Sequence, residues 1–313
     1  IRDSLVGSEM CIRDRSTGAL AAGGTLGILI PPSVILIIYS ILTEQNIAKM
    51  FLCAFIPGLL AALGYIVAIS LYVRLNQNSG PIKDRVPWKD RMYLFKNIWH
   101  IILIFVVMIG GIYMGFFTPT EGAAIGAAGT GIIAITNKSF NIKSFIEVIE
   151  STAVTTGMIF FVLLGAEFFN SFIALTQLPN LLTEFSKENN LEPLIVVACI
   201  MILYLFLGCL MDSLAMILLT IPVFFPLVMS LDFGLSPEET AIWFGILTLV
   251  VVEVGLITPP VGLNVFIINK MAKDVPIIDT FKGVIPFLLS DIIRLILLFS
   301  FPSITLIMLW AFY

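Results

Sequence analysis

The chain has 313 residues, of which 59% are hydrophobic and only 12% are charged, and its mean hydropathy is +1.05. These values exclude an ordinary soluble domain and place the chain among membrane proteins. The net charge of −4, with basic residues spread between apolar stretches, argues against nucleic-acid binding. The four scattered cysteines argue against a disulfide framework or a zinc site.

Residues 1–15 differ from the rest of the chain. They begin without methionine, carry six charges and repeat Ile-Arg-Asp near both ends. We interpret them as a foreign or artefactual tail and leave them out of the fold prediction. The natural N-terminus is then expected to be missing from this sequence.

The first apolar stretch, Ala19–Leu42, is long enough to cross a bilayer, which takes about 20 residues, but Pro31-Pro32 interrupts it. Proline removes a backbone donor and clashes with the preceding turn, so we expect one helix to end before the pair and another to begin after it. A second span, Phe51–Val73, follows. The loop Arg74–Lys96 carries six basic and two acidic residues, which predicts a cytoplasmic position.

Two further spans, Ile98–Phe117 and Ala123–Ile135, are joined by Thr-Pro-Thr-Glu. This joint has the pattern of a helix start, with Thr118 as the cap, proline in the first turn and Glu121 reaching back in a capping box. A functional role for Glu121 is the alternative.

Residues 137–152 form an amphipathic linker that is expected to lie along the cytoplasmic surface. The next span, Ala153–Leu175, carries Glu167 deep in its apolar run. An ionisable residue at that depth normally faces the bundle interior or a cavity, so Glu167 is a candidate for ion or proton coupling. The alternative is a structural acid. The acidic stretch Gln177–Glu192 is expected outside.

The stretch Pro193–Ser230 is longer than one span and has Gly208–Ser213 at its centre. A polar Asp-Ser pair beside glycine, between two short apolar arms, predicts a re-entrant hairpin whose tip stops inside the membrane. Irregular backbone at that depth is tolerated only when it is buried or lines a wet cavity. A single long tilted helix is the alternative.

A second broken helix is predicted at Ala241–Asn269, where Pro259-Pro260 follows Gly255. The last span, Ile277–Phe301, contains Asp291 and Arg294, which are three residues apart and can pair on one helix face. We interpret this pair as structural, with a subunit contact as the alternative.

The spacing between the two Pro-Pro pairs matches, to within one residue, the spacing between Ile56–Leu60 and the similar Ile285–Leu289. This agreement predicts a duplication, with repeats at 16–136 and 153–313. The loop charges indicate that the two broken helices cross the membrane in opposite directions. The predicted fold is therefore an all-α polytopic membrane protein with an inverted repeat, two discontinuous helices and a re-entrant hairpin, a build typical of secondary transporters.

Helix ends at a break leave backbone groups free, and C-terminal carbonyls favour cations. Oxygen ligands suit a hard cation, so we predict sodium sites in both halves. The second-half site comprises Gly208, Asp212, Ser213, Gly255, Thr258 and Pro259. The first-half site comprises Gly24, Thr25, Gly27 and Pro31. Its own hairpin is expected before Ser16, outside this sequence.

These features resemble the large membrane subunit of tripartite ATP-independent periplasmic (TRAP) transporters, from about Ser16 to the C-terminus. The resemblance rests on Gly24–Ser33, Phe117–Glu121, Gly208–Met216 with Leu218–Pro222, and Glu253–Asn264. It implies an elevator-type carrier in a bacterial or archaeal cytoplasmic membrane, driven by sodium and without another cofactor. The implied partners are a small membrane subunit and a periplasmic binding protein that delivers an organic acid, such as a dicarboxylate, keto acid or sugar acid.

Three other functions are alternatives for such a membrane protein. A stand-alone sodium/carboxylate carrier would need no binding protein, and an ion channel would conduct continuously. A membrane enzyme is disfavoured, because the sequence has no HExxH, Cys/His cluster or GxSxG.

Overall fold

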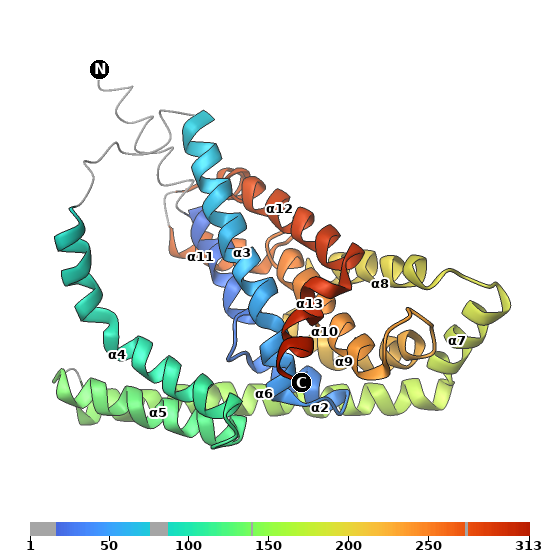
Figure 1. The fold of residues 1–313 in the computed structure, drawn as a ribbon, viewed down its shortest axis with the longest axis horizontal. Helices are drawn as coiled ribbons and strands as arrows, with labels where there is room; N and C mark the ends of the chain where they lie inside the picture. Colours follow the sequence, from blue (N-terminus) through green and yellow to red (C-terminus); the bar gives the residue numbers. More distant parts are fainter. Residues whose placement is uncertain (1–16, 76–86, 139, 273–274) are drawn as a thin grey trace. The chain divides into compact units, whose positions relative to one another are not determined.

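A computed structural model of the chain describes residues 17–75, 87–138, 140–272 and 275–313, and the regular structure of these residues is helical (Figure 1). The described residues fall into two compact units, one drawn from 1–81 and 166–313 and the other from 82–165. Residues 1–15 and the centre of the predicted cytoplasmic loop lie outside the described part of the chain.

The first Pro-Pro pair breaks a helix in the larger unit, as the sequence predicts. One helix runs over Thr17–Leu29, and α2, Val34–Leu42, begins after a 40° bend. The Pro31-Pro32 bond is cis. Ser33 caps α2, because its side chain accepts a hydrogen bond from the Leu36 amide, and its hydroxyl also donates to the Ile28 carbonyl before the break.

The second Pro-Pro pair also breaks a helix. The first part, α10, spans Pro237–Gly255 and the second, α11, spans Leu263–Met271, with a cis Pro259-Pro260 bond between them. Every residue of α10 from Thr240 to Gly255 is buried. A helix that is enclosed on all sides is a core element, so α10 is the centre of this unit.

The predicted hairpin appears as two helices, α8 at Pro193–Gly208 and α9 at Ser213–Met229, which pack against each other. A short helix, α7 at Leu178–Glu188, precedes them and also packs on α9. The single tilted helix that was the alternative is therefore wrong, because α8 ends at Gly208. How deep this turn lies in a membrane stays a prediction.

Three further helices complete the larger unit: α3 at Ile47–Leu75, α12 at Ile277–Ser300 and α13 at Pro302–Phe312. Both α3 and α12 contact α10, and α3 also packs along α12. The predicted proline-containing segments lie inside α3 and α12 without ending either helix.

Hydrogen bonds near the two ends of the first broken helix show its direction relative to the second. Near its start, Thr17 Oγ1 lies 3.3 Å from Thr280 Oγ1, at the beginning of α12, and Asn269, near the end of α11, donates to the same hydroxyl over 3.1 Å. Near its end, Tyr39 donates to the carbonyl of Ala241, at the beginning of α10, over 2.7 Å. The start of each broken helix thus lies beside the end of the other, and the two run in opposite directions.

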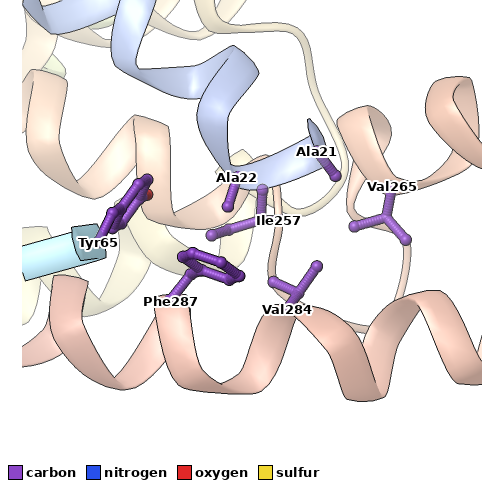
Figure 2. Close-up of a cluster of buried hydrophobic side chains, with 7 residues drawn as sticks. All are labelled: Ala21, Ala22, Tyr65, Ile257, Val265, Val284 and Phe287. Carbon is purple, nitrogen blue, oxygen red and sulfur yellow. The ribbon is translucent and has the colours of Figure 1, made fainter. Parts of the chain in front are cut away.

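An apolar cluster fills the space between these helices. Its members come from the first broken helix, α3, the second break, α11 and α12, and Figure 2 shows Ile257 near the middle of the group. The cluster consists of Ala21, Ala22, Tyr65, Ile257, Val265, Val284 and Phe287. Ile257 is fully buried just before the break, whereas Pro259 and Pro260 themselves are exposed.

The smaller unit contains α4, Trp88–Tyr113, and α5, Pro119–Thr136, which pack together. The capping box of α5 is confirmed: Thr118 accepts from the Glu121 amide, and the Glu121 carboxylate accepts from the Thr118 amide. The helix α6 runs unbroken over Ile142–Thr176, and the unit boundary falls within it. The expected surface linker and the span after it therefore form one helix.

Three helices of the described residues are long and apolar enough to cross a membrane, namely α3, α6 and α12, and the first broken helix makes a fourth if it counts as one span. Shorter apolar helices accompany them, among them α8, α9 and α13. The chain is a multi-pass membrane protein.

Candidate functional site

The second-half site is built where two helices end against each other. A Cβ added to Gly255 would lie 2.7 Å from the Cα of Gly208, and one added to Gly208 would lie 3.1 Å from the Cα of Gly255. Only glycine at both positions allows this backbone contact. The hairpin turn after α8 and the break after α10 therefore lie side by side, as the prediction required.

This contact brings the C-terminal ends of α8 and α10 together. The last carbonyls of a helix have no intrahelical partner, and the C-terminus carries the negative end of the helix dipole. A second link between the two segments is the Cys209 thiol, which lies 3.6 Å from the carbonyl oxygen of Pro259. Two converging C-termini create a negative potential from neutral groups, which suits a cation that must bind and leave again.

The side chains predicted to bind sodium follow Gly208 and Gly255 within five residues along the chain. Asp212 is exposed and is the N-cap of α9, where its Oδ2 accepts from the Leu214 amide over 3.0 Å. Ser213 is buried beside it. Thr258 is half-buried, and its hydroxyl donates to the Val254 carbonyl over 2.6 Å. Each hydroxyl or carboxylate still has lone pairs that can contact a cation.

The first-half residues are arranged differently. Thr25 and Pro31 are buried, whereas Gly24 and Gly27 are exposed. A Cβ on Gly27 would meet no described atom within 4 Å, although Gly255, at the corresponding position of the second break, touches Gly208. Gly24 faces the second half, because a Cβ there would lie 3.9 Å from Asn264 Nδ2.

Thr25 points into the second half and not into a separate site. Its hydroxyl lies 2.8 Å from the Ala22 carbonyl and 3.0 Å from Oε1 of Glu253. Glu253 is fully buried and its other oxygen, Oε2, accepts from Nη2 of Arg294 over 2.8 Å. The structure therefore joins the two halves through a carboxylate that the sequence analysis did not include in either site.

The predicted Asp291–Arg294 pair is confirmed, with 3.1 Å between Oδ1 and Nη2. Tyr65 of α3 donates to the other Asp291 oxygen over 2.7 Å. Both acids and the guanidinium are buried. One feature of the sequence could have identified Glu253 as a site residue. Thr25 and Glu253 are 228 residues apart, as are the two Pro-Pro pairs.

The two remaining acidic candidates are Glu167, in α6, and Glu121, in the first turn of α5. Glu167 is exposed on α6, and no described hydrogen bond connects it with a break, so its coupling role stays a prediction. Glu121 serves the cap of α5: the backbone amide and hydroxyl of Thr118 donate to its carboxylate and lower the pKa of that group.

The broken helices, their opposed directions and the buried polar groups between them define a polytopic membrane protein built like a secondary transporter. Residues 11–304 match the family described as tripartite ATP-independent periplasmic transporter, DctM component, and the chain belongs to this family. The match includes residues 11–15, part of the segment that we set apart as a tail.

Several relatives are similar along most of the chain. The C4-dicarboxylate TRAP transporter large permease protein DctM of Pseudomonas aeruginosa is 32% identical over 92% of this chain and 66% of its own length. The sialic acid TRAP transporter large permease protein SiaM of Vibrio cholerae is 30% identical over 94% and 67%. The isethionate TRAP transporter permease protein DctMQ of Oleidesulfovibrio alaskensis is 28% identical over 82% and 40%. This chain spans about two thirds of the length of the first two relatives.

Proposed function

We propose that this chain is the large permease subunit of a sodium-coupled TRAP transporter that imports an organic acid across a cytoplasmic membrane. The observation that carries the sodium site is the contact between Gly208 and Gly255, which brings two helix C-termini together beside Asp212 and Thr258. Helix C-termini and oxygen-bearing side chains are suitable ligands for a small hard cation.

The opposed directions of the two broken helices support an inverted repeat, in which an equivalent break faces the opposite side of the membrane. Alternating access then follows when the helices around the breaks move as a body relative to the rest of the protein. An elevator-type motion of this kind is part of the proposal.

The substrate class is proposed from the relatives, whose names specify a C4-dicarboxylate, sialic acid and isethionate. All three are organic acids. The family description, a tripartite periplasmic transporter, supports two partners for this chain: a small membrane subunit and a periplasmic binding protein that delivers the acid.

The site is tested by sodium-driven uptake in liposomes that contain the complete transporter and its binding protein. Asp212→Ala, Ser213→Ala and Thr258→Ala each remove an oxygen from the second-half site. We expect each to raise the half-saturating sodium concentration by about tenfold, which corresponds to the loss of about 1.4 kcal/mol of binding free energy. Unchanged sodium dependence in all three variants would refute the site.

Asp232→Ala is the matched control for Asp212→Ala. Asp232 also accepts a hydrogen bond from the backbone amide two residues later, that of Gly234, over 2.8 Å. It lies in the turn between α9 and α10, away from the helix breaks. Sodium dependence is expected to stay at the wild-type value in this control.

Two measurements distinguish the proposed function from the alternatives. Uptake into the same liposomes without the binding protein would favour a stand-alone carrier, and a continuous sodium conductance in a planar bilayer would favour a channel. We expect neither uptake without the binding protein nor a continuous sodium conductance.

A further inference from the structure

The two broken helices touch each other at equivalent positions. Thr25 and Glu253 are separated by 228 residues, as are the two Pro-Pro pairs, so each residue lies at the same distance before its own break. The Thr25 hydroxyl nevertheless bonds directly to Glu253 Oε1, over 3.0 Å. Each also lies two residues before a glycine of a predicted sodium site, Gly27 or Gly255.

The link continues from Glu253 to α12. Glu253 Oε2 and Arg294 Nη2 are 2.8 Å apart, and the same nitrogen lies 3.1 Å from Asp291 Oδ1. The side chains of Glu253 and Asp291 are 0% exposed and that of Arg294 is 4% exposed. Glu253 is therefore held from one side by a fixed cation and from the other by the hydroxyl of the first helix.

Stability alone is a poor explanation for this arrangement. Removing charges from water costs several kcal/mol per ion, and a buried ion pair is often no more stable than apolar residues of the same size. The cluster also holds two carboxylates against one guanidinium. What the arrangement does provide is a fixed geometry between two helices that both end at a cation site.

We propose that Glu253, fixed by Arg294, is a positioning residue that couples the two half-sites, so that sodium bound at one break raises the affinity for sodium at the other. This inference rests on the proposed sodium-coupled function. The mechanism is mechanical: a shift of either helix end on cation binding moves Thr25 or Glu253, and their hydrogen bond transmits the shift. Coupling of this kind is reciprocal.

The test is a sodium-binding isotherm of the purified complete transporter in detergent or nanodiscs, compared between two matched variants. Glu253→Gln and Asp291→Asn each remove one carboxylate charge and leave one acid paired with Arg294. Only Glu253→Gln removes the ion pair of the residue that accepts the Thr25 hydrogen bond. We expect the Hill coefficient to fall from about 2 to about 1 in Glu253→Gln and to stay near the wild-type value in Asp291→Asn.

A second pair of variants changes Thr25, the first-half partner of Glu253. This pair tests the coupling between the half-sites even if Glu253→Gln does not fold. Thr25→Val keeps the volume and loses the hydroxyl, whereas Thr25→Ser keeps the hydroxyl. The sodium binding that Thr258→Ala weakens belongs to the second half-site. We expect its half-saturating concentration to rise about fivefold or more in Thr25→Val and to be restored in Thr25→Ser.

The outcomes separate this inference from the function on which it rests. If the wild-type protein binds no sodium, the proposed function is refuted. If it binds sodium but cooperativity survives in folded Glu253→Gln, or is lost equally in Asp291→Asn, the coupling role of Glu253 is overturned and the sodium sites remain. An unaltered second-site affinity in Thr25→Val also overturns it.

Discussion

Two glycines allow the ends of α8 and α10 to meet through their backbones. An alanine Cβ at position 255 would lie 2.7 Å from the Cα of Gly208, and backbone cannot move aside as a flexible side chain can. We expect Gly255→Ala to lower the free energy of unfolding by about 1–3 kcal/mol. It should also weaken sodium binding, because the carbonyl ends of the two helices separate. Thermal unfolding with and without sodium measures both effects.

Gly23→Ala is the control for this substitution. Gly23 is exposed within the first helix, and a Cβ there would meet no described atom within 4 Å. Alanine in a helix interior is favoured over glycine by about 0.5–1 kcal/mol, so this variant should unfold at the same temperature or higher. Equal behaviour of Gly23→Ala and Gly255→Ala would contradict the role of the glycine contact.

At the residue scale, the sequence predicts what depends on the local backbone. The cap at Thr118 and the i, i+3 pair of Asp291 and Arg294 are visible because their partners are neighbours in the sequence. Glu253 was missed as a site residue because its partners, Thr25 and Arg294, lie on other elements. Only the common repeat spacing could have connected it with Thr25.

At the element scale, the start of α5 depends on one capping box. Thr118→Ala removes the side-chain acceptor of the Glu121 amide, and loss of such a cap costs about 1 kcal/mol. We expect amide hydrogen exchange over the first turn of α5 to become about fivefold faster. Thr118→Ser keeps the hydroxyl and should retain wild-type protection. Equal exchange in both variants would show that packing, and not the cap, fixes this helix end.

The sequence predicted the breaks in helices better than it predicted where a helix continues. Two successive prolines interrupt the hydrogen bonds of a helix, and both Pro-Pro pairs lie between helices. Single prolines at 57 and 286 are accommodated inside α3 and α12. The boundary expected near residue 152 has no breaking residue, since the segment Glu150-Ser151-Thr152-Ala153 carries neither glycine nor proline. Polarity alone does not end α6 there.

At the scale of the whole molecule, the contacts of the larger unit tie the start of each broken helix to the end of the other. Tyr39, in α2, donates to the Ala241 carbonyl at the start of α10. Thr17, at the start of the first broken helix, and Asn269, near the end of α11, both lie within hydrogen-bond distance of the Thr280 hydroxyl. Loop charge could predict opposed directions because it reports the side of the membrane, but it could not predict which side chains meet between the helices.

The opposite directions of the two broken helices lead to a prediction for the orientation of the chain in the membrane. Glu44 directly follows the first broken helix, and Lys270 lies at the end of the second. Both are exposed. In an inverted repeat these equivalent positions face opposite sides of the membrane, whereas in a parallel repeat they would face the same side. From the charge of the basic loop Arg74–Lys96 we predict that Glu44 lies outside and Lys270 in the cytoplasm.

Single cysteines at these positions test the orientation in intact cells, in a background where the native cysteines are serine. We expect a membrane-impermeant maleimide to label Glu44→Cys at once and Lys270→Cys only after permeabilisation. Asp232→Cys, in the exposed turn before α10, should behave like Glu44→Cys. Labelling of Glu44→Cys and Lys270→Cys from the same side would rule out the inverted repeat. The two helix breaks could then not serve as opposed half-sites of one transport cycle.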